Sequence, residues 1–170
     1  MGVSVKFHLK WGHIFHNTPD IEGPLPPGPT LHVLGGMGLH TDFDIGEFQR
    51  ISIDSVEAAI RDARTRPGGV PVMDVVCLTT HAQGPNKPEK YKLLQGNPVV
   101  REYNAKVTQL CREHNFPVLE FFNVTRNTHT WDGQHFGMTG NVLKVQILLN
   151  WLSTLNAGFP CYKPFEFAQG

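Results

Sequence analysis

The sequence has little charge and no long hydrophobic run. Only 18% of its 170 residues are charged, and fifteen basic side chains balance fifteen acidic ones. A balanced chain lacks the overall field with which many proteins attract nucleic acid or an anionic membrane surface. No apolar run approaches the roughly 18–20 residues of a membrane-spanning helix. We therefore expect no nucleic-acid partner and no membrane partner, and any ligand must be recognised locally.

Cysteine is also scarce, and the start of the chain carries no secretory signal. The three cysteines, Cys77, Cys111 and Cys161, are too few and too scattered for a disulfide framework or a zinc site, so we expect buried thiols. The opening residues, MGVSVKFHLKWGH, have neither a basic segment nor the long apolar segment of a signal peptide. By default this predicts a cytoplasmic location.

Turn-forming residues are abundant, with seventeen glycines and thirteen prolines. This composition favours a fold with many defined turns over a disordered chain. A chain of 170 residues has room for one domain, which we place at residues 1–156. The remaining residues, 157–170, are expected to form an irregular tail.

Hydrophobic periodicity predicts four strands and three helices, in the order β, β, α, β, α, β, α. The strands are expected at residues 3–11, 30–34, 70–78 and 116–122, and the helices at 53–66, 98–114 and 139–155. Either Asp54 or Ser52 could cap the first helix. On the last helix we expect one apolar row to lie in the core. That row consists of Val142, Val145, Leu149 and Leu152.

The helical connections between successive strands indicate the fold class. Parallel strands need long crossovers, which place helices on the faces of the sheet. We therefore predict an α/β fold, namely a three-layer αβα sandwich with a mainly parallel, flavodoxin-like sheet. Residues 17–29 are rich in proline and glycine and are expected to form a surface loop.

Polar loops follow three of the predicted strands. Ligands of open parallel sheets bind at the carboxyl ends of the strands. The loops there are residues 36–42 (GMGLHTD), 79–84 (TTHAQG) and 123–137, which contains TWDGQH. We expect these loops to meet at one edge of the sheet and to form the functional site.

Within these loops, Asp132 and His135 are the most specific candidates for catalytic residues. Three residues of tight turn can place the carboxylate beside the imidazole, so that Asp132 orients His135 as a general base. Backbone N–H groups around Gly38 could bind a developing oxyanion, with His40 as a neighbouring donor. His81 and Trp131 could line the substrate pocket. Alternatively, His81 is satisfied by the loop backbone and Trp131 only packs the loop down.

Histidines could instead form a metal site. His8, His13 and His16 lie close together in the sequence, and His129 and His135 flank Asp132. Neutral imidazoles are good ligands for zinc or copper. No cysteine or carboxylate completes a recognised spacing in the first group, and we expect neither a metal nor another cofactor. A metal-dependent hydrolase remains a third hypothesis.

Taken in order, these motifs resemble the PC-esterase branch of the SGNH (GDSL-like) hydrolases. The resemblance rests on Gly38-Leu39-His40 after one strand, Thr80-His81 after the next, and Asp132-x-x-His135 before a final helix, and it covers roughly residues 5–152. This branch includes polysaccharide and sialic acid O-acetyltransferases. The resemblance implies a catalytic role for Asp132 and His135, and an oxyanion-binding role for Gly38 and His40.

The chain departs from this branch at its amino terminus. The branch carries a nucleophilic serine in a Gly-Asp-Ser block that follows its first, usually central, strand. Here that block would precede residues 3–11, and Ser4 lies inside the strand pattern, where no elbow presents it. The sequence therefore predicts an SGNH-type scaffold with an Asp–His dyad, a missing first strand and no visible nucleophile.

Two functions from different classes follow from this pattern. The first is an esterase or O-acetyltransferase-like domain that acts on acyl esters of carbohydrates or similar molecules, with its serine on a longer amino terminus. In that case the protein would be secreted or reside in the Golgi. The second is a non-catalytic pseudo-esterase that binds a ligand or a protein. In both cases a partner chain or a rearrangement would have to cover the exposed edges of the sheet.

Overall fold

The computed structural model describes residues 30–35, 38–65 and 73–155. The strand expected at residues 3–11, the loop at 17–29 and the tail at 157–170 lie outside the described residues, as do Ser4, His8, His13, His16 and Cys161. None of the described helices is long and apolar enough to cross a membrane.

The described elements alternate between strands and helices, as the periodicity predicted. The strands are β1 (Thr30–Gly35), β2 (Met73–Leu78) and β3 (Val118–Leu119). The helices are α1 (Ile45–Phe48), α2 (Asp54–Thr65), α3 (Glu89–Gln95), α4 (Asn97–Glu113), α5 (Phe122–Thr125) and α6 (Met138–Leu155).

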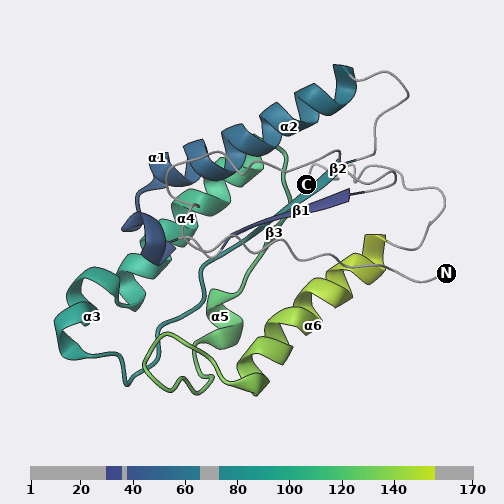
Figure 1. Cartoon of the computed structure of the whole chain (residues 1–170). Coiled ribbons are helices and arrows are strands. Elements are labelled where there is room, and N and C mark those ends of the chain that lie inside the picture. The colour runs from purple at the N-terminus through teal and green to yellow at the C-terminus, as the bar shows by residue number, and fades with distance from the viewer. Residues whose placement is uncertain (1–29, 36–37, 66–72, 156–170) are drawn as a thin grey trace.

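The three strands form a parallel sheet in the order β1-β2-β3. Helices α2 and α4 cover one face, and α6 runs along the other (Figure 1). The predicted three-layer α/β fold with a parallel sheet is therefore confirmed. Strand β1 pairs directly with β2, from Thr30 opposite Met73 to Gly35 opposite Leu78.

The helical segment between β1 and β2 begins earlier than predicted. Asp44, and neither Ser52 nor Asp54, caps it: the carboxylate accepts hydrogen bonds from the N–H groups of Gly46 at 2.7 Å and Glu47 at 3.4 Å. Helix α1 continues through a π-helical turn, Gln49–Ile53, into α2. The periodicity missed this start because the π turn breaks the 3.6-residue repeat.

The region around β3 also differs from the prediction. Only Val118 and Leu119 pair with β2, although a strand was expected over residues 116–122. The main chain then turns into α5, where the buried Thr125 hydroxyl donates to the carbonyl of Phe121 at 2.6 Å. A run of large apolar residues suits a buried strand and a buried helical turn equally well.

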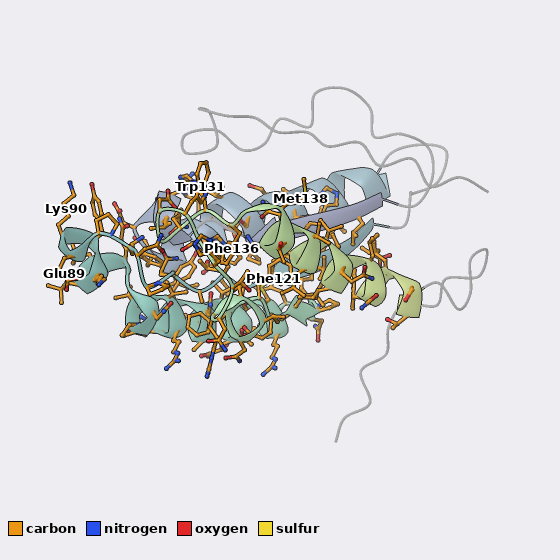
Figure 2. The ribbon with its side chains drawn as sticks, turned by 90° about the horizontal axis from the view of Figure 1, so that it is seen from below. Glu89, Lys90, Phe121, Trp131, Phe136 and Met138 are labelled. Carbon is orange, nitrogen blue, oxygen red and sulfur yellow. A yellow bond between two sulfur atoms is a disulfide. The ribbon has the colours of Figure 1, made fainter. Side chains whose placement is uncertain are left out.

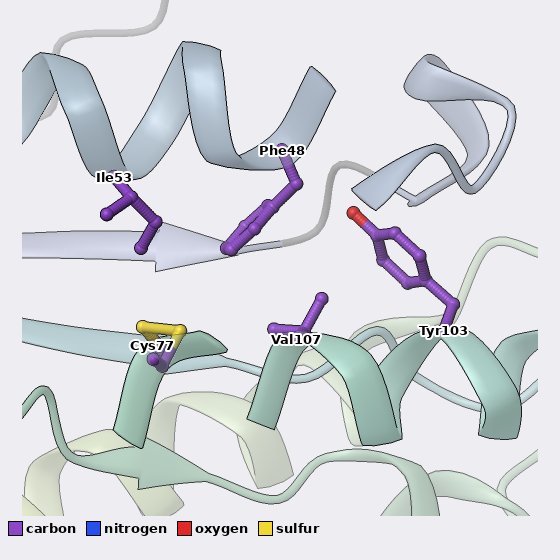
Figure 3. Packing of buried hydrophobic residues seen from close by; sticks show 6 residues of the cluster. Phe48, Ile53, Cys77, Tyr103 and Val107 are labelled. Carbon is purple, nitrogen blue, oxygen red and sulfur yellow. A yellow bond between two sulfur atoms is a disulfide. The ribbon is translucent and has the colours of Figure 1, made fainter. Parts of the chain in front are cut away.

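The core lies between the sheet and the helices α1, α2 and α4. Phe48 and Ile53 point toward Cys77, Tyr103 and Val107 (Figure 3). Cys77 of β2 and Cys111 of α4 are joined by a disulfide across 34 residues of sequence, so the expectation of free thiols at these two positions is wrong. The crossing of α4 over β2 sets their Cα atoms 6.5 Å apart, within the range of a disulfide. Sequence spacing alone does not reveal this crossing.

Helix α6 forms where it was predicted, but most of its expected core row is exposed. Val142, Val145 and Leu149 are each more than half exposed, so their assignment to the core is wrong. Leu152, the last member of the row, is partly buried, together with Leu148. The helix carries apolar residues on more than one side, so its periodicity could not select the face that meets the sheet.

Candidate functional site

The predicted pair Asp132 and His135 lies in a tight turn between β3 and α6. Asp132 Oδ1 accepts hydrogen bonds from the N–H groups of Gln134 at 2.9 Å and His135 at 2.7 Å. Its second oxygen, Oδ2, accepts from His135 Nδ1 at 2.6 Å. The turn is possible because Gly133 has a φ of +83°, which is a left-handed conformation that suits glycine.

The hydrogen bonds fix the charge of the aspartate and the tautomer of the histidine. The N–H of His135, its ring Nδ1 and the N–H of Gln134 hold the pKa of Asp132 well below its usual range. The ionised carboxylate accepts from Nδ1–H, so Nε2 is the nitrogen that can take up a proton. Both side chains are at least half exposed. The pair is therefore open to a ligand from solvent.

An aromatic side chain borders the pair on the outside. Trp131 is 73% exposed, and its ring meets that of His135 edge to face at a centroid distance of 5.9 Å. Figure 2 shows Trp131 projecting outward, whereas the buried Phe136 lies among other side chains. Trp131 therefore offers an apolar surface next to His135.

His81 lies against the turn and has a partner for each ring nitrogen. Nε2 donates to the carbonyl of Gln134 at 3.1 Å, and Nδ1 accepts from Lys144 Nζ at 3.5 Å. The ring packs edge to face on Phe136. Burial, and then the charge of Lys144, lower the pKa of His81 to about 4. These bonds match the alternative in which His81 supports the loop rather than contacting a ligand.

The loop after β2, which carries His81, is fastened to α4 by two asparagines. Asn104 bonds both the N–H and the carbonyl of Thr80, and Asn97 does the same for Gln83. Sequence reasoning missed both residues. Their separation of seven, which places them on one face of a helix, is the signal that could have found them.

The same loop is joined to the turn that carries the dyad. The N–H of Gly84 donates to the carbonyl of Gly133 at 2.8 Å. Asn86 and Thr130 exchange two hydrogen bonds: Asn86 Nδ2 donates to the Thr130 carbonyl, and the Thr130 hydroxyl donates to Asn86 Oδ1. Hydrogen bonds from the loop after β2 therefore hold the turn that contains Asp132 and His135.

Gly38 and His40, the predicted oxyanion residues, lie in a 3₁₀ helix after β1 (Gly38–Thr41). A Cβ at Gly38 would lie 3.0 Å from Thr80 Oγ1, so this loop packs on the loop after β2. His40 is exposed and lines a hollow of about 310 Å³ together with Asp42, Asp44 and Glu47. Gly38 thus packs on Thr80, whose neighbour His81 bonds the carbonyl of Gln134, whereas His40 faces an acidic hollow.

A larger groove, of about 800 Å³, lies elsewhere, along α4 and α5. Arg101, Arg112, Glu120 and Asn123 are among its lining residues, and none of the predicted site residues is. In the described ranges no three histidine, cysteine or acidic side chains come together as a metal site. His129, although near Asp132 in sequence, thus completes no such group.

Comparison with known proteins shows one similar fold. The structure resembles that of Est24, a carbohydrate acetylesterase from Sinorhizobium meliloti, with a TM-score of 0.57 and 15% sequence identity. The match covers 78% of this chain and 63% of Est24, so the chain spans less than two thirds of that enzyme. No family model and no curated protein sequence matches the chain. At this identity the likeness establishes a shared α/β fold.

Proposed function

We propose that this chain is an SGNH-type esterase or O-acetyltransferase-like domain of the PC-esterase branch, acting on acyl esters of carbohydrates. The observation that carries the proposal is the hydrogen bond of 2.6 Å between Asp132 Oδ2 and His135 Nδ1, with Oδ1 held by two backbone N–H groups. This arrangement is what a general base needs, because it fixes the orientation of the ring and leaves Nε2 free of the carboxylate. The fold shared with a carbohydrate acetylesterase supports the same substrate class.

In the proposed reaction, His135 Nε2 takes the proton from a serine hydroxyl. The serine oxygen bonds to the acyl carbon, and N–H groups near Gly38 stabilise the resulting oxyanion. The C–O bond to the sugar then breaks, and His135 returns the proton to the leaving alkoxide. Water, or the hydroxyl of an acceptor sugar, accepts the acyl group in the second step. Trp131 would hold the sugar beside His135.

We propose that the nucleophile is a serine of a Gly-Asp-Ser block, a motif that the printed sequence does not contain. The printed chain alone should therefore show at most weak turnover of p-nitrophenyl acetate and of acetylated sugars. A form of the protein that carries such a block should show robust turnover. Robust turnover by the printed chain that is abolished by Ser4→Ala would contradict this assignment of the nucleophile.

The roles of the dyad are tested in a form of the protein that carries the Gly-Asp-Ser block. We expect His135→Ala and Asp132→Asn each to lower kcat by about 10³-fold or more, as removal of a triad member does in serine hydrolases. His129→Ala is the matched control, because His129 is exposed in the same loop and should leave kcat unchanged. Equal rates in wild type, His135→Ala and Asp132→Asn would refute the proposed mechanism.

The pseudo-esterase remains the alternative if no form of the protein carries such a block. It keeps the pocket for recognition, so acylated sugars should bind without turnover. His135→Ala and Trp131→Ala should then weaken binding of an acylated sugar, as measured by calorimetric titration. A protein-interaction module that makes no use of the pocket would bind its partner equally well with either substitution.

A further inference from the structure

Lys87 is a lysine buried beneath the turn that carries the dyad. Only 6% of the residue is exposed, and its ammonium donates to Gln83 Oε1 at 2.8 Å and to Gln134 Oε1 at 3.3 Å. Both of these partners are neutral carboxamides. Burial lowers the pKa of Lys87, and the negative charge of Asp132 opposes that change.

Burying an ammonium group only to fill space is energetically unfavourable. Removing a charged amine from water costs several kcal/mol even in a relaxed protein, and apolar residues of similar volume often serve stability as well or better. A lysine with two amide partners therefore points to a role other than packing. That role follows from what its two partners touch.

Gln134 is the residue through which Lys87 reaches the dyad. It lies between Asp132 and His135 in the turn, and its N–H donates to Asp132 Oδ1 at 2.9 Å. Its carbonyl accepts from His81 Nε2, and its side chain accepts from Lys87. Gln134 is therefore held on two sides, and each restraint limits how the carboxylate of Asp132 can move.

The main chain of Lys87 supports the same turn from below. A Cβ at Gly133 would overlap the backbone N and Cα of Lys87, so the two main chains are in direct contact. Lys87 also closes a turn of its own, because its N–H donates to the carbonyl of Gly84 at 3.2 Å, and the N–H of Gly84 donates to Gly133. One residue thus contacts the turn through its backbone and through its charge.

We propose that Lys87 is a positioning residue for the dyad: through Gln134 its buried ammonium fixes the turn in which Asp132 Oδ2 accepts from His135 Nδ1. This inference rests on the proposed function, because it assumes that the dyad works. Lys87 touches neither substrate nor the reacting atoms. Its effect is to hold His135 in the Nδ1–H tautomer that leaves Nε2 ready to accept a proton.

The tautomer of His135 provides a direct test. The ¹⁵N chemical shifts of its ring nitrogens, measured where the ring is neutral, report the ratio of the Nε2–H to the Nδ1–H form. We expect the Nδ1–H form to dominate in the wild type. Asp132→Asn removes the carboxylate that favours this form, so its ratio serves as the reference for complete loss of the preference. Lys87→Met should raise the Nε2–H to Nδ1–H ratio about tenfold, as the loss of one charged hydrogen bond would. Lys87→Arg should restore most of the wild-type ratio.

The matched control is Lys106→Met, which removes a lysine of α4 that is exposed and paired with Glu102. It should leave the tautomer ratio unchanged. An unchanged ratio in a folded Lys87→Met variant overturns the proposal. If Lys87→Met does not fold, Gln134→Ala takes its place, since it removes the acceptor through which the ammonium reaches the turn, together with the side-chain amide that lies 3.2 Å from His81 Nε2. An unchanged tautomer ratio of His135 in Gln134→Ala would also overturn the proposal.

Ester hydrolysis separates this proposal from the proposed function. In a form of the protein that carries the Gly-Asp-Ser block, Lys87→Met should lower kcat about tenfold or more, with little change in KM. If no form of the protein hydrolyses esters but Lys87→Met still shifts the tautomer, the positioning role holds and the esterase proposal fails. If esters are hydrolysed but Lys87→Met changes neither kcat nor the tautomer ratio, the esterase proposal holds and the positioning role fails.

Discussion

Asn104 holds the main chain of Thr80 with both ends of its carboxamide. Its Nδ2 donates to the Thr80 carbonyl at 2.8 Å, and its Oδ1 accepts from the Thr80 N–H at 2.8 Å. These two bonds satisfy the same groups that a neighbouring strand would satisfy. Asn104 and Thr80 are both buried. Helix α4 therefore holds the loop that carries His81 two residues after β2 ends at Leu78.

Replacing Asn104 should therefore be costly. Asn104→Ala leaves two buried peptide groups without a partner, at about 1–3 kcal/mol each, so we expect unfolding in urea to require about 2–5 kcal/mol less free energy. Gln109→Ala is the control, because Gln109 is an exposed residue of the same helix and bonds only Glu113 through its side-chain amide. A loss no larger than that of the control would show that the Asn104 bonds contribute little.

Alanine should be tolerated at one of two glycines near the dyad and not at the other. Gly133 has a positive φ, and a Cβ there would overlap the backbone of Lys87. We expect Gly133→Ala to destabilise the protein by about 2 kcal/mol or more and to disturb the Asp132–His135 bond. Gly137→Ala should be nearly neutral, because a Cβ there meets nothing within 4 Å. Thermal unfolding of both variants tests this contrast.

The bond between Cys77 and Cys111 should contribute strongly to stability. It closes a loop between residues 34 apart, and the chain-entropy relation then gives about 3–4 kcal/mol at 25 °C. The double variant Cys77→Ala/Cys111→Ala should lose that amount, and a reducing agent should destabilise only the wild type. Peptide mapping without reduction checks the pairing directly. Recovery of free thiols at both positions would contradict it.

Stability should fall below pH 6.5 because of His81. Its pKa is lowered from 6.5 to about 4 in the folded protein, so in this window the unfolded chain binds a proton that the folded chain does not. The free energy of unfolding should therefore decrease as the pH falls from 6.5 to 4, by up to about 1.4 kcal/mol per pH unit. Above pH 6.5 this contribution is constant.

The pH effect is assigned by comparison with His81→Gln. The difference in unfolding free energy between the wild type and this variant should change between pH 6.5 and pH 4 and stay flat above that range. His32, whose pKa burial also lowers, remains in both proteins and cancels in the difference. Parallel curves for the two proteins over the whole range would exclude His81 as the source.

Elements set by local pattern were predictable from the sequence. The apolar run that forms β1, the β-branched run of β2 and the helical repeats of α4 and α6 carry their own periodicity, and each element forms within a few residues of its expected place. Helix α3 was not predicted. Its exposed Leu93 and Leu94 follow no amphipathic pattern, and the helix starts after Pro88 without a capping side chain.

In the candidate site, too, local features were predictable from the sequence and long-range contacts were not. Asp132 and His135 are three residues apart, so a local turn was enough to predict that they would meet. Lys87, Asn104 and Gln134 were not found, because what makes them important is a contact 24 to 47 residues away along the chain. A lysine or an asparagine in isolation looks like a solvated surface residue.

The sequence by itself determined the alternation of strands and helices, and from it the parallel α/β fold, because backbone periodicity depends on neighbouring residues. It also determined the pairing of Asp132 with His135, because three residues of turn leave few other arrangements. Only the tertiary structure decided which cysteines join, which face of α6 meets the sheet and which buried groups hold the turn. Those outcomes depend on how α4 and α6 pack on the sheet, and packing is a property of surfaces that lie far apart in the sequence.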